Sequence, residues 1–452
     1  MSIPFVGVTF LNHSCISISS ETTEILCDPW FEGSAFGNGW RLLCEESHRL
    51  DKLNFDYLWI SHEHPDHFSI PTLRHLPDGS QVIYQKTQDQ KVKRYLESRH
   101  SVIELADLER RRFRDIEVQL FRCDGYDSAM SFRLPTGQAI VNVNDCRVEL
   151  GDLTRKIRDE TGGIDLLAMQ FSYANWAGNR GDNEIPRLQH QQVISRIRET
   201  CTALKPNFLL LFASYVYFSH EENFYWNEHS WLREAYNELK NDVSIIIPTP
   251  GYKFDIRDVE KEQLTYTTES AINFWENIHN TRTPIDKMTA AKSKDDLVDQ
   301  FGKFFKNHWA SNDLELAKLT LAPDLDIHIH ISDLNFVMYF NLMTGESRVV
   351  EDHVYDISVS SEMLSILFTS SFGRGTATIS GRIQFNYPTA FKFFTFFFIF
   401  YANNNGRYFK NGGIAPSEFG SIAHTAVLAN IFRVSPEGRQ NYEEFAKSWN
   451  IL

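Results

Sequence analysis

The sequence predicts a layered α/β sandwich in which helices cover the outer faces of two sheets. Residues 5–27 contain three short β-rich runs (FVGVTF, SCISIS, TEILC) separated by polar turns, as in adjacent antiparallel strands. Apolar strands are also predicted at 164–170, 207–212 and 243–248, with a helix over 187–204 between the first two. Because strands followed by helices recur along this region, the pattern argues against a helix bundle and against an all-β barrel.

The segment between these two regions alternates in the same way. Residues 55–60 (FDYLWI) are predicted to form a buried strand that runs directly into a histidine-rich loop. Helices are expected at 70–76 and 88–96, and strands at 82–84, 118–121, 130–134 and 139–143. The turn Pro135-Thr136-Gly137 joins the last two strands into a hairpin.

A Lys- and Asp-rich stretch at 285–298 is the predicted domain boundary. We therefore expect a first domain over 1–285 and a second, α+β domain over 299–452. The second region combines amphipathic helical segments with the alternating strands LDIHIHI, FVMYF and ATISGRIQF. Its most apolar window, 391–400, is interrupted by Lys392 and is shorter than the roughly 20 residues of a membrane-spanning helix, so it is expected to be core.

Composition limits the classes of function. The chain has 452 residues, 42% of them hydrophobic, and a formal net charge of −14, which is typical of a soluble globular protein and argues against binding to long nucleic acids. Its six cysteines form no C-x-x-C pair, and the N-terminus lacks the apolar stretch of a secretory signal. We therefore expect a cytoplasmic protein.

The segment Ser61-His62-Glu63-His64-Pro65-Asp66-His67 directly follows the strand predicted at 55–60. Three imidazoles and a carboxylate are costly to bury without partners, and a bound metal offsets that cost. In an extended turn His62 and His64 can point to one side while Asp66 and His67 face a neighbouring position. The spacing therefore suits two adjacent metal ions.

This H-x-H-x-D-H arrangement resembles the metal motif of the metallo-β-lactamase superfamily, whose fold is an αββα sandwich. The resemblance implies further ligands: Asp145, after a predicted strand, as the carboxylate that bridges two ions, and His220, after the strand at 207–212, as the last histidine. The superfamily's usual third histidine is absent between His100 and Asp145, so Asp124 or Asp127 would replace it. A carboxylate there favours iron or manganese over zinc.

A narrower resemblance, over residues 5–260, is to CMP-N-acetylneuraminate hydroxylases. It rests on 28–36 (DPWFEGSAF), 60–67, Asp124-Gly125, 142–146 and 212–215; ascorbate phosphate lactonases are similar only over the metal motif and the Asp-Gly loop. Residues 354–385 are similar to a sterol-carrier-like module. The hydroxylases carry a Rieske iron–sulfur domain, whose C-x-H and C-x-x-H pair this sequence does not contain. The resemblance thus implies a ferredoxin or reductase as a separate electron donor.

Two functions follow, both on a small-molecule substrate. In the first, two irons and O₂ hydroxylate or oxidise the substrate. In the second, two zinc or manganese ions hydrolyse an ester, lactone or phosphodiester, with Asp66 holding or deprotonating the attacking water and Asp145 bridging the ions. A non-catalytic protein with a structural metal is a third alternative.

Two further features are left open. His13, in Leu11-Asn12-His13-Ser14-Cys15, is interpreted either as a residue beside the metals or the substrate, or as an ordinary turn histidine. The aromatic loop after the strand at 164–170 offers Tyr173, Asn175 and Trp176 as walls of a pocket or as a packed surface loop.

Overall fold

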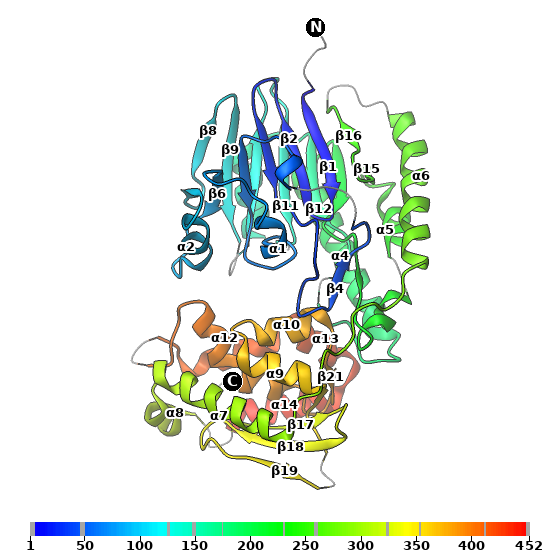
Figure 1. Cartoon of the computed structure of the whole chain (residues 1–452). Helices are drawn as coiled ribbons and strands as arrows, with labels where there is room; N and C mark the ends of the chain where they lie inside the picture. The colour runs from blue at the N-terminus through cyan, green and yellow to red at the C-terminus, as the bar shows by residue number, and fades with distance from the viewer. Residues whose placement is uncertain are drawn as a thin grey trace.

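The computed structural model describes residues 5–45, 50–123, 127–146, 151–173, 175–228, 231–256, 261–321, 325–351, 354–410 and 413–448. Figure 1 shows two bodies, one built from the blue to green part of the chain and one from the yellow-green to red part. None of the described helices combines the length and the apolar character that a membrane crossing requires.

The first body contains two stacked seven-stranded sheets. One sheet has the order β16-β1-β2-β3-β5-β6-β7, and the other has the order β15-β13-β12-β11-β10-β9-β8. Their strands are β1 (Gly7–Asn12), β2 (Cys15–Ser19), β3 (Glu24–Cys27), β5 (Tyr57–Ile60), β6 (Gln81–Gln85), β7 (Ser101–Leu105), β8 (Arg110–Phe113), β9 (Ile116–Arg122), β10 (Ser128–Arg133), β11 (Ala139–Asn144), β12 (Leu166–Gln170), β13 (Phe208–Phe212), β15 (Ser244–Ile246) and β16 (Lys253–Phe254).

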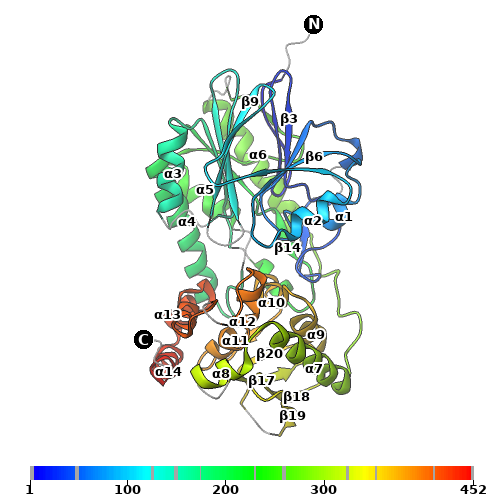
Figure 2. The ribbon, with the colours of Figure 1, turned by 90° about the vertical axis from the view of Figure 1, so that its left-hand side faces the viewer.

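Both faces of this sandwich carry helices (Figure 2). Leucines and valines of α1 and α2 pack with the outer side of β3, β5 and β6 in one apolar cluster, and a larger cluster fills the space between the sheets. The helices are α1 (Ile70–Leu73), α2 (Lys91–Glu97), α3 (Asp152–Thr161), α4 (Glu184–Leu204), α5 (Leu232–Leu239) and α6 (Lys261–Asn280), with short 3-10 turns at Leu50–Lys52 and Phe224–Glu228. The predicted αββα arrangement is confirmed, because two stacked sheets carry helices on both outer faces.

The second body is built on a five-stranded sheet of order β19-β18-β17-β20-β21. Its phenylalanine-rich window at 391–400 forms two short helices with mostly buried side chains, as expected of core. The elements are α7 (Lys294–Ser311), α8 (Leu314–Thr320), β17 (Asp326–Ile331), β18 (Phe336–Asn341), β19 (Ser347–Val350), β20 (Ile357–Val359), α9 (Ser361–Thr369), α10 (Gly373–Ser380), β21 (Gln384–Phe385), α11 (Phe391–Phe396), α12 (Phe398–Asn404), a 3-10 turn at Pro416–His424, α13 (Ala426–Val434) and α14 (Pro436–Ser448).

One predicted strand of this region is wrong. Residues 373–380, which include the start of ATISGRIQF, form α10, and only Gln384–Phe385 pairs in the sheet. The reason is tertiary packing: a side chain at Gly373 would approach the carbonyl oxygen of Ile366 to 2.5 Å, so α10 lies tightly against α9. That contact outweighs the β propensity of the Thr- and Ile-rich run.

The two bodies meet around a two-stranded ribbon of β4 (Trp40–Leu42) and β14 (Val216–Phe218). The guanidinium of Arg382 is fully buried there and donates to Glu222 at 2.7 Å, to Glu362 at 2.6 Å and to the carbonyl of Gly37 at 2.5 Å. Asn179 adds a pair of hydrogen bonds with the backbone of Phe385. These contacts bring α10 and β21 against the edge of the sandwich.

Candidate metal centre

The histidine-rich loop begins where the buried strand β5 ends. Asp28, just beyond the parallel neighbour β3, accepts hydrogen bonds from the backbone N–H of Ser61 at 2.7 Å and from its hydroxyl at 2.6 Å. The carbonyl of Ser61 in turn accepts from Ser128 at 2.7 Å and from Gln85 at 3.1 Å. The first residue of the loop is therefore fixed from both sheets.

His62, His64 and Asp127 form the first group of potential ligands. Nε2 of His62 lies 2.9 Å from Nδ1 of His64 and 3.9 Å from Oδ1 of Asp127. One ligand atom from each of the three residues falls within 4.8 Å of the other two. Two imidazoles and one carboxylate thus converge on a volume that one ion can occupy.

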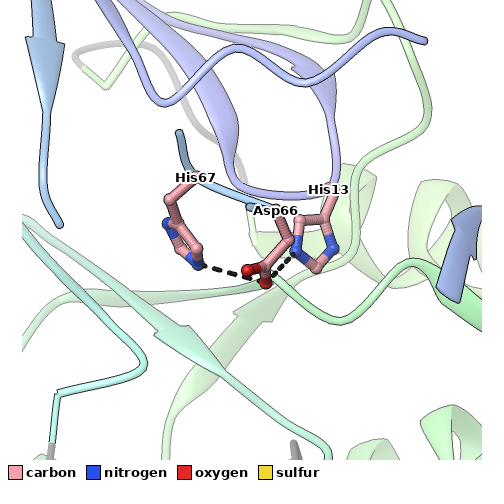
Figure 3. A group of neighbouring side chains, drawn as sticks. All are labelled: His13, Asp66 and His67. Carbon is pink, nitrogen blue, oxygen red and sulfur yellow. Dashed lines mark hydrogen bonds and ion pairs between the residues drawn. The ribbon is translucent and has the colours of Figure 1, made fainter. Parts of the chain in front are cut away.

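His13, Asp66 and His67 form the second group, drawn in Figure 3. Oδ2 of Asp66 lies 3.3 Å from Nε2 of His13 and 3.5 Å from Nε2 of His67. His13 comes from the turn between β1 and β2, where its φ of 40° is left-handed. This turn places the His13 ring beside the carboxylate of Asp66, which lies 53 residues later in the sequence.

Asp145 joins the two groups. It directly follows β11, and its Oδ2 lies 3.6 Å from Nε2 of His62 and 3.9 Å from Nε2 of His67. Its other oxygen is buried without a hydrogen-bond partner. One carboxylate oxygen therefore faces an imidazole of each group, which is the placement expected of a bridging ligand.

The pKa values of these side chains depend strongly on burial and on the charges of their neighbours. Although burial opposes it, the carboxylates of Asp66, Asp145 and Asp28 raise the pKa of His67 to about 10. Burial lowers the pKa of His62 to about 3, whereas burial and the nearby charge of Asp145 raise the pKa of Asp127. A cation would relieve this concentration of carboxylates by stabilising their charged forms.

The cluster fits metal ions by its own chemistry. Nδ1 of His13, Oδ1 of Asp66 and Oδ1 of Asp145 are buried and have no hydrogen-bond partner among the described residues. Buried polar atoms of this kind are normally paired, and a coordinated ion would use the oxygen atoms of both carboxylates. The residues therefore fit two cations side by side, one in each group.

Of the ligands expected from sequence, the structure brings together His62, His64, Asp66, His67, Asp127 and Asp145. Asp124 lies outside the described residues. His220 is not brought to the cluster: its ring nitrogens lie 3.8 Å from Glu222 and from Glu362, beside the buried Arg382. The physical reason is that residue 220 pairs with Asp286 in an isolated bridge, which turns it toward the second body.

His13 is an imidazole whose role the sequence left open. It completes the group with Asp66 and His67, and Trp30 packs edge-on against it with the ring centroids 5.5 Å apart. The one available signal was its position in a tight Asn12-His13-Ser14 turn between two strands. A turn histidine acquires a ligand role only when the sheet places that turn beside the loop after β5.

Residues 7–133 match the family model described as Beta-lactamase superfamily domain. The chain is 28% identical over 283 residues to the cytidine monophosphate-N-acetylneuraminic acid hydroxylase of Pongo pygmaeus, which covers 57% of this chain and 47% of the relative. The chain thus spans about half the length of the curated relatives it matches.

Solved structures of two kinds are similar over part of the chain. One is CmlA, a diiron beta-hydroxylase from Streptomyces venezuelae, at 16% identity, a TM-score of 0.35 and coverage of 61% of this chain and 52% of that one. The other is a possible metal-dependent hydrolase from Veillonella parvula, at 13% identity, a TM-score of 0.42 and coverage of 56% and 100%. From its sequence relationships, its two stacked sheets and the histidine–aspartate cluster at their edge, we conclude that this chain is a metallo-β-lactamase-fold protein.

Proposed function

We propose that the protein is a dinuclear non-haem iron oxygenase that hydroxylates or oxidises a small molecule. The observation that carries the proposal is the position of Asp145, whose Oδ2 faces His62 and His67 at 3.6 and 3.9 Å and so connects two separate groups of ligands. The curated hydroxylase relatives support the same class of reaction.

The ligand set favours iron over zinc. It offers the carboxylates of Asp66, Asp127 and Asp145 beside four imidazoles, so three of seven side chains are hard, anionic donors. When bound, a pair of reduced irons supplies the electrons and the open coordination positions that dioxygen activation requires. The electrons would come from a separate ferredoxin or reductase.

The protein's own residues orient the ligands. Nδ1 of His67 donates to Asp28 at 2.9 Å, so Nε2, which faces Asp66 and Asp145, is the nitrogen that could coordinate a metal after losing its proton. The hydroxyl of Ser61 lies 3.0 Å from Nδ1 of His62 and fixes that ring in the same way. Both imidazoles are thereby held with Nε2 available for coordination.

Aromatic side chains limit the access of water. The ring centroid of Trp30 lies 5.5 Å from that of His13, and the centroid of Phe36 lies 5.8 Å from that of His64. Trp30 and Phe36 are both buried. An apolar wall beside each group of ligands protects an oxidising site from solvent.

A metal-dependent hydrolase of an ester, lactone or phosphodiester is the second candidate. The group of His13, Asp66 and His67 favours it, because two imidazoles and one carboxylate also suit zinc or manganese. Asp66 would then hold a proton of the attacking water through Oδ1, which has no other hydrogen-bond partner in the described structure.

Metal analysis separates the two candidates. Protein is purified without added metal, its iron, zinc and manganese are measured, and oxygen uptake with a chemical reductant is compared with turnover of ester, lactone and phosphodiester substrates. About two irons per chain with reductant-dependent oxygen uptake support the oxygenase. Stoichiometric zinc with hydrolytic turnover and no oxygen uptake would contradict the oxygenase and support the hydrolase.

A further inference from the structure

A pocket lies at the same edge of the sandwich as the candidate metal centre. Phe171, Ser172 and Tyr173 follow β12, which is the neighbour of β11, and Ser214 and Tyr215 follow β13, the next strand beyond it. Together with residues of the ribbon, α5 and α6 they line a pocket of about 50 Å³. No residue of the metal centre lines it.

Aromatic rings form most of the pocket wall. Eight of its lining residues are aromatic, and four of these are Trp40, Trp226, Trp231 and Trp275, out of nine tryptophans in the whole chain. Tyr173 and Trp231 meet edge-on with their centroids 6.0 Å apart, and the indole N–H of Trp231 donates to the hydroxyl of Tyr173 at 2.9 Å. The π faces of indole and phenol rings carry partial negative charge.

The pocket contains little positive charge of its own. No lysine or arginine is among its lining residues, and none in the described part of the chain stacks on Trp40, Trp226 or Trp275. Burial lowers the pKa of His279, so its imidazole is neutral near pH 7. Glu276 contributes a carboxylate that Arg233, outside the lining, holds at 2.7 and 2.8 Å.

Size restricts the occupant. Pockets that enclose a whole drug-sized ligand typically measure about 300–1,000 Å³. A volume of about 50 Å³ accommodates only a compact group. Among compact groups, indole and phenol faces bind substituted ammonium ions in preference to neutral groups of the same shape, because the ring quadrupole attracts the cation.

We propose that this pocket binds a quaternary or methylated ammonium group and is a ligand site distinct from the metal centre. The aromatic loop that follows β12 supplies one of its walls through Tyr173. Trp176, in the same loop, does not contribute: it is fully buried against Phe385 of the second body. The site therefore depends on Tyr173 and Trp231, which are both half-buried. His190 stacks on one face of the Trp231 indole with the ring centroids 4.5 Å apart, so a cation would meet the other face.

Binding of choline and of tetramethylammonium is measured by calorimetry and by tryptophan fluorescence, with and without a metal chelator. The neutral isostere 3,3-dimethylbutanol is the matched ligand. We expect saturable binding of both cations, unchanged by the chelator, and affinity for the isostere that is at least about tenfold weaker. Absence of saturation at millimolar cation, or equal affinity for choline and the isostere, would overturn the proposal.

Two pairs of variants locate the site. Tyr173→Leu and Trp231→Leu keep apolar bulk but remove a ring, and we expect each to weaken cation binding about tenfold. Tyr173→Phe and Trp231→Phe keep a ring and should retain most of the affinity. Trp309→Leu, at a half-buried tryptophan of α7, is the control and should leave binding unchanged. If both leucine variants keep the thermal unfolding of the parent protein and still bind the cation with unchanged affinity, the cation binds elsewhere and the proposal is wrong.

Discussion

Asp28 and His67 are 39 residues apart in sequence, yet Oδ2 of Asp28 accepts a hydrogen bond from Nδ1 of His67 at 2.9 Å. The carboxylate also accepts from Ser61 and Asn144, so four donors hold it in place beneath the cluster. The contact fixes which nitrogen of His67 is free for a metal.

Asp28→Asn keeps the volume of this side chain and removes its charge. We expect metal affinity to fall about 10- to 100-fold, because the amide no longer enforces the orientation of the His67 ring. Competition with a fluorescent chelator measures the change. Asp78→Asn, at an exposed carboxylate paired with Arg99, is the control, and equal affinities in the two variants would contradict the role of Asp28.

We expect opposite effects on metal content from variants of His13 and His220. His13→Ala should lower the bound metal by about one ion per chain, since this ring completes the group with Asp66 and His67. His220→Ala should leave the metal content unchanged, because its ring faces Glu222 and Glu362. Elemental analysis of the two purified variants decides between them; loss of an ion only in the His220 variant would restore that residue as the ligand.

The identity of the metal should depend on Asp127. Replacing this carboxylate by an imidazole in Asp127→His makes the first group softer, so we expect the zinc-to-iron ratio of the isolated protein to rise. Asp124→His, made in parallel, tests the neighbouring carboxylate. A shift in the Asp124 variant alone would transfer the ligand role from Asp127 to Asp124.

His308, in α7, makes stability dependent on pH. Its side chain is buried between Phe304 and Trp309 with no hydrogen bond on either ring nitrogen, and burial lowers its pKa to about 3. Between about pH 6.5 and pH 3 the His308 imidazole is protonated in the unfolded state, where its pKa is near 6.5, but stays neutral in the folded state. The unfolding free energy is therefore lost as the pH falls through this window.

From pH 7 to pH 5 this loss amounts to about 2 kcal/mol. His308→Leu should therefore flatten the pH dependence of the unfolding free energy over that range, which urea titrations at several pH values measure. An unchanged slope would show that other groups dominate acid destabilisation.

Arg382 joins the two bodies through a buried network. Arg382→Gln leaves Glu222 and Glu362 without their main charge partner, and we expect a loss of about 3 kcal/mol of unfolding free energy. Arg348→Gln removes an exposed pair with Glu346 and should change stability by less than about 1 kcal/mol. Chemical denaturation of both proteins measures the difference, and a loss for Arg382→Gln as small as that for Arg348→Gln would show that the network adds little.

The sequence by itself determined the layered sandwich and the central motif. Apolar runs of four to seven residues predicted β5, β9, β11, β12 and β13, because burial of alternate or continuous apolar side chains leaves a pattern that can be read locally. His62, His64, Asp66 and His67 could be assigned to a metal centre because they lie in one short loop whose chemistry is unusual without a cation.

Tertiary structure alone decided which of the more distant candidate ligands lies in the cluster. His13 and His220 both occupy loops after strands, and no local pattern distinguishes them. The strand order β1-β2-β3-β5 within the first sheet brings the turn after β1 to Asp66, whereas the bridge with Asp286 directs His220 toward Arg382. The same reason explains α10, where the close approach of Gly373 to α9 overrides local propensity. Contacts between segments far apart in sequence fix these positions, and such contacts leave no local periodicity to detect.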